Sequence, residues 1–129
     1  MIVADCSAIV DALTAPPGTD ALRSELAADD LHAPALLDFE VVSALRGLVM
    51  RGEVSQARAQ DALVDYDDLP IERWPSDSAL RKRSFALRDS ISAYDAAYVA
   101  LAEALQCPLV TRDERLRRAH GHHAEIRVL

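Results

Sequence analysis

The first residues of the chain, Ile2–Ala4, form a short and unbroken apolar run. Such a run is typical of a strand that is buried on both faces, as in a parallel sheet covered by helices. Asp5 follows it directly, and Ser7 stands where we expect the N-cap of a helix over residues 8–13. Ligands of open α/β sheets bind outside the carboxyl ends of the strands, so Asp5 is the first candidate site residue.

The remaining chain alternates short apolar runs with amphipathic segments, which indicates βαβ units. Further strands are predicted over residues 31–33, 69–73, 108–111 and 126–128. Further helices are predicted over residues 19–28, 34–51, 55–68, 76–88, 93–106 and 113–120. We therefore expect one α/β domain over residues 1–129, with a short central parallel sheet flanked by helices on both faces.

Composition narrows the class of protein. The 129 residues suit a single domain, and no apolar run approaches the ~18–20 residues that cross a membrane. The N-terminus lacks the basic start of a secretion signal, and two cysteines do not make a disulfide framework. We therefore expect a cytoplasmic protein that does not enter a membrane.

The net charge of −7 argues against a general nucleic-acid coat protein, but this charge is unevenly spread. Residues 1–72 carry 14 acidic and 4 basic residues, whereas residues 73–129 carry 7 acidic and 10 basic residues. A local basic surface is thus available for RNA phosphates, although solvated side chains explain the same pattern equally well. The candidate contacts are Arg81, Lys82, Arg83, Arg88, Arg112, Arg115, Arg117 and Arg118.

Two further acids lie on helices that otherwise read as buried. Glu40 belongs to the predicted helix over residues 34–51, and its neighbours one turn away are apolar or small: Leu36, Leu37, Ser43 and Ala44. Asp95 is one of two charged residues in the segment 93–105, where 11 of 13 residues are apolar. A buried carboxylate is costly unless it is paired or binds a cation. Taken alone, however, Asp95 is explained as readily by a capping box with Ser92.

Asp113 is the fourth acid of this kind. It follows the apolar residues Leu109 and Val110 much as Asp5 follows Ile2–Ala4. Taken alone, Asp113 is also explained by a helix N-cap. Right-handed crossovers would nevertheless bring all four carboxylates to the same edge of the sheet, with no lysine or arginine fixed between them.

Four neighbouring carboxylates repel one another and raise one another's pKa, and a divalent cation resolves that repulsion. Ligands that are all oxygen select Mg²⁺ or Mn²⁺ over zinc. Such a site suits in-line attack of metal-activated water on a phosphodiester, which leaves a 5′-phosphate and a 3′-hydroxyl. Cys6 carries no sign of a nucleophile, and adjacent His122 and His123 read as surface residues.

At this point the sequence resembles the PIN-domain ribonucleases, specifically the VapC toxins of bacterial toxin–antitoxin pairs. The resemblance spans nearly the whole chain in the family's order and spacing. Its motifs are Asp5-Cys-Ser7, Pro34 with Glu40-Val-Val-Ser-Ala-Leu45, Tyr94-Asp95-Ala-Ala-Tyr-Val-Ala-Leu-Ala102, and Val110-Thr-Arg-Asp113-Glu-Arg-Leu116.

The resemblance implies that Asp5, Glu40, Asp95 and Asp113 form an acidic site for Mg²⁺ or Mn²⁺. It places Ser7 and Thr111 beside that site as hydroxyl groups, and Arg112 is a candidate contact to an RNA phosphate or simply a solvated side chain. It further implies an endoribonuclease that cuts a specific tRNA or rRNA, a homodimer, and inhibition by a VapB-like antitoxin. The helix expected near residues 35–51 has apolar residues on more than one face, so it is a candidate for either protein interface.

Other readings fit the residues less well. A response-regulator receiver needs an acidic pair after its first strand and a lysine after a late strand, and the only lysine here is Lys82 within a helix. A haloacid-dehalogenase-type phosphatase needs Asp-x-Asp, but Ser7 replaces the second acid. A non-enzymatic binding module remains an alternative, although it gives no physical reason to keep four repelling carboxylates.

Overall fold

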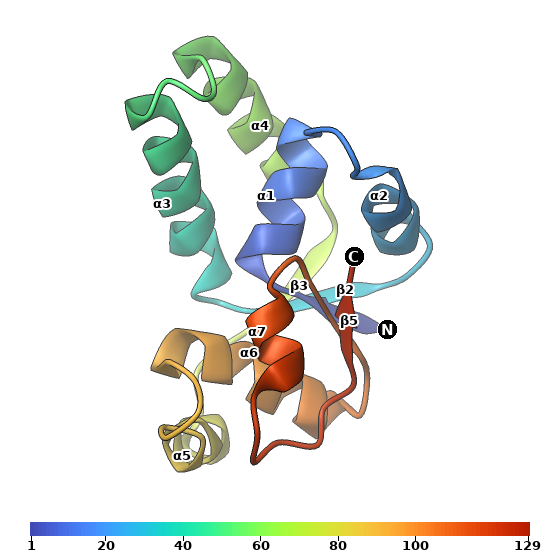
Figure 1. The fold of residues 1–129 in the computed structure, drawn as a ribbon, viewed down its shortest axis with the longest axis vertical. Helices are drawn as coiled ribbons and strands as arrows, with labels where there is room; N and C mark the ends of the chain where they lie inside the picture. Colours follow the sequence, from blue (N-terminus) through green and yellow to red (C-terminus); the bar gives the residue numbers. More distant parts are fainter.

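The computed structural model describes residues 1–129 as a five-stranded parallel sheet with seven helices (Figure 1). The strands are β1 (Ile2–Ala4), β2 (Leu31–Pro34), β3 (Ile71–Trp74), β4 (Leu109–Thr111) and β5 (Ile126–Val128). The helices are α1 (Cys6–Thr14), α2 (Asp20–Ala27), α3 (Leu37–Met50), α4 (Gln56–Asp68), α5 (Ser78–Ala86), α6 (Ala93–Leu105) and α7 (Glu114–Arg118). The predicted α/β fold with a parallel sheet is confirmed.

The order of the strands, β3-β2-β1-β4-β5, puts the N-terminal strand at the centre of the sheet. Val3 pairs in register with His32 of β2 on one side and with Leu109 of β4 on the other. The chain therefore builds outward from β1 in one direction and then, through β4, in the other. The carboxyl ends of β1 and β4 flank this topological switch point, where open α/β sheets bind their ligands.

Helices cover both faces of the sheet. Figure 1 shows α1–α4 on one side of the sheet and α5–α7 on the other. Helix α6 packs across β1, β2 and β4. Six of its residues are buried: Ala96 and the run Tyr98–Ala102. This agrees with its almost wholly apolar sequence, because a helix buried on most of its surface cannot be amphipathic.

Three helices begin two or three residues away from the expected position. Asp5, rather than Ser7, is the N-cap of α1, two residues earlier than predicted, because its extended backbone lets its carboxylate accept from the Ala8 amide. Asp77, rather than Ser76, caps α5 by the same contact to Leu80. Helix α3 begins only at Leu37, because Pro34 still belongs to β2.

Two structural absences complete the description of residues 1–129. Neither cysteine is in a disulfide, as predicted. None of the seven helices combines the length and the apolar character that crossing a bilayer requires.

Candidate active site

Asp5 lies at the centre of a small hydrogen-bond network where β1 meets α1. Its Oδ1 accepts from Ser7 Oγ at 2.6 Å and from the Ala8 amide at 3.0 Å. Its Oδ2 accepts from Thr111 Oγ1 at 2.5 Å. The side chain is nonetheless buried, and this burial raises the pKa of Asp5 above its ordinary value, opposed by the three donors and reinforced by the charge of Asp95.

The two hydroxyl groups also tie this network to the loop after β4. Ser7 Oγ accepts from the Arg112 amide at 3.0 Å, and Thr111 Oγ1 accepts from the Asp113 amide at 3.0 Å. Both hydroxyls therefore donate to Asp5 and accept from the backbone that leads into α7. This fixes the direction of the Asp5 carboxylate relative to the end of β4.

Glu40 is half-buried on α3, facing α6. Its Oε1 accepts from the phenolic hydroxyl of Tyr98 at 2.6 Å, and Tyr98 is almost fully buried. Burial raises the pKa of Glu40, the hydrogen bond from Tyr98 opposes that shift, and the charges of Asp95 and Asp5 add to it. Glu40, Asp5 and Asp95 therefore share one electrostatic neighbourhood.

Asp95 lies in the first turn of α6, and the structure resolves its two proposed roles. Its backbone amide donates to Ser92 Oγ at 3.2 Å, so Ser92 is the N-cap. Its carboxylate does not return to Ser92, and it makes no hydrogen bond or ion pair anywhere within residues 1–129. The capping box is therefore absent, and a half-buried carboxylate beside two other acids is left without a partner.

Asp113 is held differently from the other three acids. It is the N-cap of α7, as the alternative reading predicted, accepting from the Arg115 amide at 2.9 Å. Its carboxylate also binds the Arg115 guanidinium, with Oδ2 and Nη2 2.7 Å apart, and this contact lowers the pKa of Asp113. The expected gathering of four carboxylates is thus incomplete: no three acidic, histidine or cysteine side chains of residues 1–129 stand close enough to coordinate one ion.

Cys6 lies beside these acids, but its thiol is not activated as a nucleophile. Burial, together with the charges of Glu40 and Asp5, raises the pKa of Cys6 to about 12. The thiolate is the reactive form of cysteine, so at neutral pH this side chain stays an inert thiol. This agrees with the sequence, which gave no indication of a catalytic cysteine.

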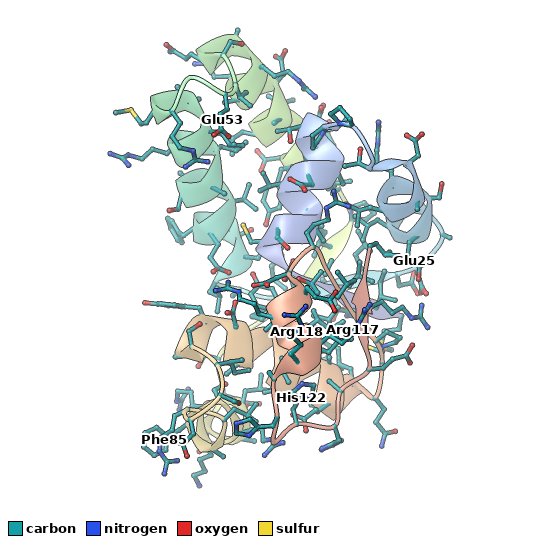
Figure 2. All side chains as sticks on the ribbon, viewed as in Figure 1. Glu25, Glu53, Phe85, Arg117, Arg118 and His122 are labelled. Atoms are coloured by element: carbon teal, nitrogen blue, oxygen red, sulfur yellow. The ribbon has the colours of Figure 1, made fainter.

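The predicted basic contacts fall into two groups. Several are already bound to acids within the chain: Arg83 to Glu103, Arg112 to Asp11, Arg115 to Asp113 and Arg117 to Glu114. Arg112 also donates from Nη1 to the carbonyl of Leu129. Others make no ion pair and remain open to solvent: Arg81, Lys82, Arg88 and Arg118. Figure 2 shows Arg117 and Arg118 together on α7.

Two residues at the site were missed by the sequence reasoning. In the sequence, Tyr98 looked like one more apolar position of the helix. It follows Asp95 by three residues, however, so the two side chains are neighbours on the helix surface. Arg115 read as a candidate RNA contact, although its place two residues after an N-cap aspartate was a signal for the contact that it makes.

The sequence matches the PIN domain family over residues 2–121. It is 40% identical over 129 residues to Ribonuclease VapC12 of Mycobacterium tuberculosis, covering 100% of this chain and 99% of that protein. It is 45% identical over 116 residues to Ribonuclease VapC9 of the same organism, covering 90% and 88%. The crystal structure of VapBC2 from Rickettsia felis, bound to a promoter DNA fragment, has the same fold, with a TM-score of 0.68 over 100% of this chain and 99% of that chain at 14% identity.

Proposed function

This chain belongs to the PIN-domain family and to its VapC ribonucleases, and from that membership we propose that it is an endoribonuclease dependent on Mg²⁺ or Mn²⁺. It hydrolyses phosphodiester bonds of a specific tRNA or rRNA in the cytoplasm, as the toxin of a type II toxin–antitoxin pair. The observation that supports the metal site best is the group of Asp5, Glu40 and Asp95. The charge of Asp95 raises the pKa of the other two, and none of the three carboxylates makes an ion pair within residues 1–129.

The donor set of this group fits a hard divalent cation. All of its ligand atoms are carboxylate oxygens, and neighbouring hydroxyls rather than ammonium or guanidinium groups balance Asp5. Asp5, Asp95 and Asp113 would hold the ion, and Glu40 would either hold a second ion or orient the attacking water. A divalent ion bound there lowers the pKa of water and neutralises charge on the scissile phosphate.

Asp113 can take part because its present partner is weakly held. Arg115 is largely exposed, with 84% of its side chain accessible. An ion pair with an exposed partner contributes little to stability, because solvent screens it. A divalent ion can therefore compete for Asp113, and Ser7 and Thr111 keep Asp5 directed toward the same end of β4.

A direct experiment compares cleavage of total RNA by the purified, antitoxin-free protein with Mg²⁺, with Mn²⁺ and with EDTA. We expect discrete fragments with a 5′-phosphate and a 3′-hydroxyl in either metal, and none in EDTA. Restoring the metal to the EDTA sample should restore cleavage, which separates loss of the ion from loss of the fold. Equal cleavage in EDTA, or fragments with 2′,3′-cyclic ends, would contradict the proposal.

Tyr98→Phe gives a second prediction, concerning the pH dependence of cleavage. The Tyr98 hydroxyl favours the ionised form of Glu40, so its removal should raise the pKa of Glu40 further. A larger fraction of Glu40 is then protonated at any given acidic pH. We expect the acid limb of kcat/KM against pH to move to higher pH.

Tyr66→Phe is the matched control for this prediction. Tyr66 is also buried and also donates to an acid, Asp38 at 2.5 Å, but it lies on α4 and makes no contact with Glu40 or Asp95. Its removal should leave the pH profile unchanged. If kcat/KM depended on pH in the same way in both variants, the ionisation of Glu40 would not control the rate of cleavage.

The proposed partners are a VapB-like antitoxin and a second copy of this chain. Helix α3 supports this part of the proposal, because three of its apolar side chains remain exposed: Phe39, Val42 and Met50. A groove of about 240 Å³ lies between α3 and α4, with Val42, Val49 and Leu63 among its lining residues. Exposed apolar surface of this extent is typical of a protein interface.

A further inference from the structure

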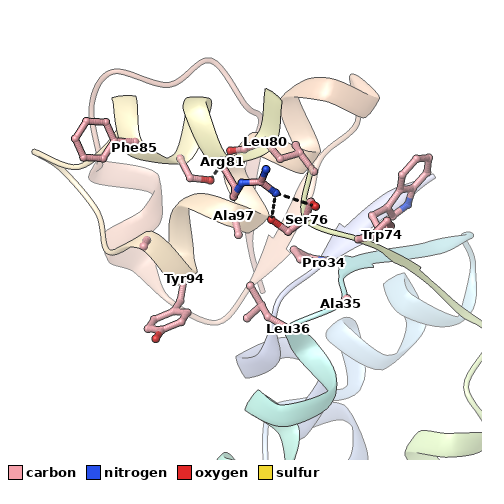
Figure 3. A pocket seen from close by; sticks show the side chains of 13 residues that line it. Pro34, Ala35, Leu36, Trp74, Ser76, Leu80, Arg81, Phe85, Tyr94 and Ala97 are labelled. Carbon is pink, nitrogen blue, oxygen red and sulfur yellow. Dashed lines mark hydrogen bonds between the residues drawn. The ribbon is translucent and has the colours of Figure 1, made fainter. Parts of the chain in front are cut away.

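A hollow of about 420 Å³ lies beside the acids, where the carboxyl ends of β2 and β3 face α5 and α6 (Figure 3). Leu36, Trp74, Leu80 and Ala97 form apolar parts of its wall. Its volume falls within the range of about 300–1,000 Å³ that is usual for small-ligand sites. None of the four acids of the proposed catalytic site lines this hollow.

The hollow adjoins the acidic group through two elements that they share. Tyr94 lines the hollow and immediately precedes Asp95 in the first turn of α6. Leu36 lines it from the start of α3, four residues before Glu40. A ligand in the hollow would thus lie next to a phosphodiester bond that is bound at the acids.

Arg81 supplies the only charge of this wall. Its Nη1 donates to the Ser76 carbonyl at 3.0 Å and to Ser76 Oγ at 3.1 Å, which fixes the guanidinium plane. Its Nε and Nη2 make no hydrogen bond within residues 1–129 and remain free for a ligand. Figure 3 shows this group between Ser76 and Leu80.

The charge around the hollow complements an anion. None of its thirteen lining residues is acidic, although the chain as a whole carries a net charge of −7. Helix α5, which provides Arg81, contains three basic residues and no acidic one. An anionic ligand with an apolar, planar part matches both properties, and an RNA nucleotide has both.

We propose that this hollow receives one unpaired base of the RNA, next to the bond that is cut, and that it sets the base preference of cleavage. This inference rests on the proposed ribonuclease function. Unpaired bases bind proteins by stacking on aromatic or guanidinium planes and by hydrogen bonds to their edges. The fixed Arg81 guanidinium provides free donors and a planar surface. Tyr94 and Trp74 lie at the edges of the hollow as aromatic surfaces, and the indole N–H of Trp74 already donates to His32 Nδ1 at 3.0 Å.

Trp74 makes a test that does not depend on catalysis. It is the single tryptophan of the chain and lines the hollow, so its fluorescence reports a bound base directly. The protein is titrated in EDTA, where no cleavage is expected, with four homopolymeric RNA tetranucleotides and with hexaglutamate. We expect saturable quenching by RNA, strongest for one base, and none by hexaglutamate.

Two variants, each with a matched control, locate the binding. Ala97→Leu fills the hollow from α6, whereas Ala104→Leu adds the same side chain at an exposed position of the same helix. Arg81→Gln removes the free guanidinium, whereas Arg23→Gln removes an exposed charge of α2 outside the hollow. We expect the first member of each pair to weaken binding about tenfold or more, and the second to change it less than threefold.

The cleavage of a randomised single-stranded RNA pool completes the test. Ala97→Leu should flatten the preference at one nucleotide position beside the cut while metal-dependent cutting continues. Cutting with an unchanged preference would overturn the base site and leave the ribonuclease intact. Quenching without any cutting by the wild type would overturn the ribonuclease, and stronger quenching by hexaglutamate than by RNA would assign the hollow to an acidic peptide instead.

Discussion

Asp95→Asn lowers kcat/KM for RNA cleavage by about 1,000-fold or more, while the protein stays folded. The Asp95 carboxylate makes no hydrogen bond or ion pair within the chain, so its neutral isostere breaks none of the fold. The substitution removes an anionic oxygen ligand from the proposed metal site, where a single electrostatic contact is worth two to three orders of magnitude or more. Single-turnover cleavage at saturating Mn²⁺, beside a thermal melt, measures both effects.

Ser92→Ala is the matched control, because it separates the carboxylate from the helix cap. It removes the hydroxyl that accepts from the Asp95 amide and leaves the carboxylate in place. We expect it to cost about 1 kcal/mol of stability, as N-cap deletions do, with cleavage retained within several-fold. If Ser92→Ala abolished cleavage and Asp95→Asn did not, Asp95 would be a capping residue only.

Arg83→Ala is expected to lower the free energy of unfolding by about 2–3 kcal/mol. Glu103 is 5% exposed, and Arg83 donates to both of its carboxylate oxygens at 3.1 and 3.0 Å. Arg83 also donates to the Gly121 carbonyl at 2.9 Å, so it joins α5, α6 and the loop before β5. Its removal leaves a buried carboxylate with only exposed His123 beside it. Urea denaturation at neutral pH measures the loss.

Lys82→Ala provides the comparison, because Lys82 is adjacent, exposed and without an ion pair. It should change stability by about 0.5 kcal/mol or less. Replacing both members of the buried pair, as Arg83→Met with Glu103→Met, should recover most of the loss, since apolar side chains of similar size avoid the desolvation penalty. Weakened RNA binding by Arg83→Ala at unchanged stability would instead make Arg83 the phosphate contact that its position beside Lys82 suggested.

The sequence by itself determined the features that depend on neighbours along the chain. The sequence indicated a buried strand at Ile2–Ala4 and a buried helix over residues 93–105, because neither segment has enough polar residues to form a solvent-exposed face. Cap positions were predicted to within two residues, because aspartate and serine compete as N-caps and only the backbone conformation decides between them, as at Asp5 and Ser7. That metal ligation involves all four acids stays a prediction.

The tertiary structure alone decided the contacts between residues far apart in the sequence. Tyr98 of α6 reaches Glu40 of α3 across the carboxyl edge of the sheet, and Arg83 reaches Glu103 because α5 packs against α6. No periodicity encodes which partner a helix meets. The bond of Asp113 to Arg115, by contrast, joins residues two apart and depends on their side-chain rotamers. Local pattern fixes what each segment must bury, whereas the pairing of buried polar groups is set by how the segments close together in space.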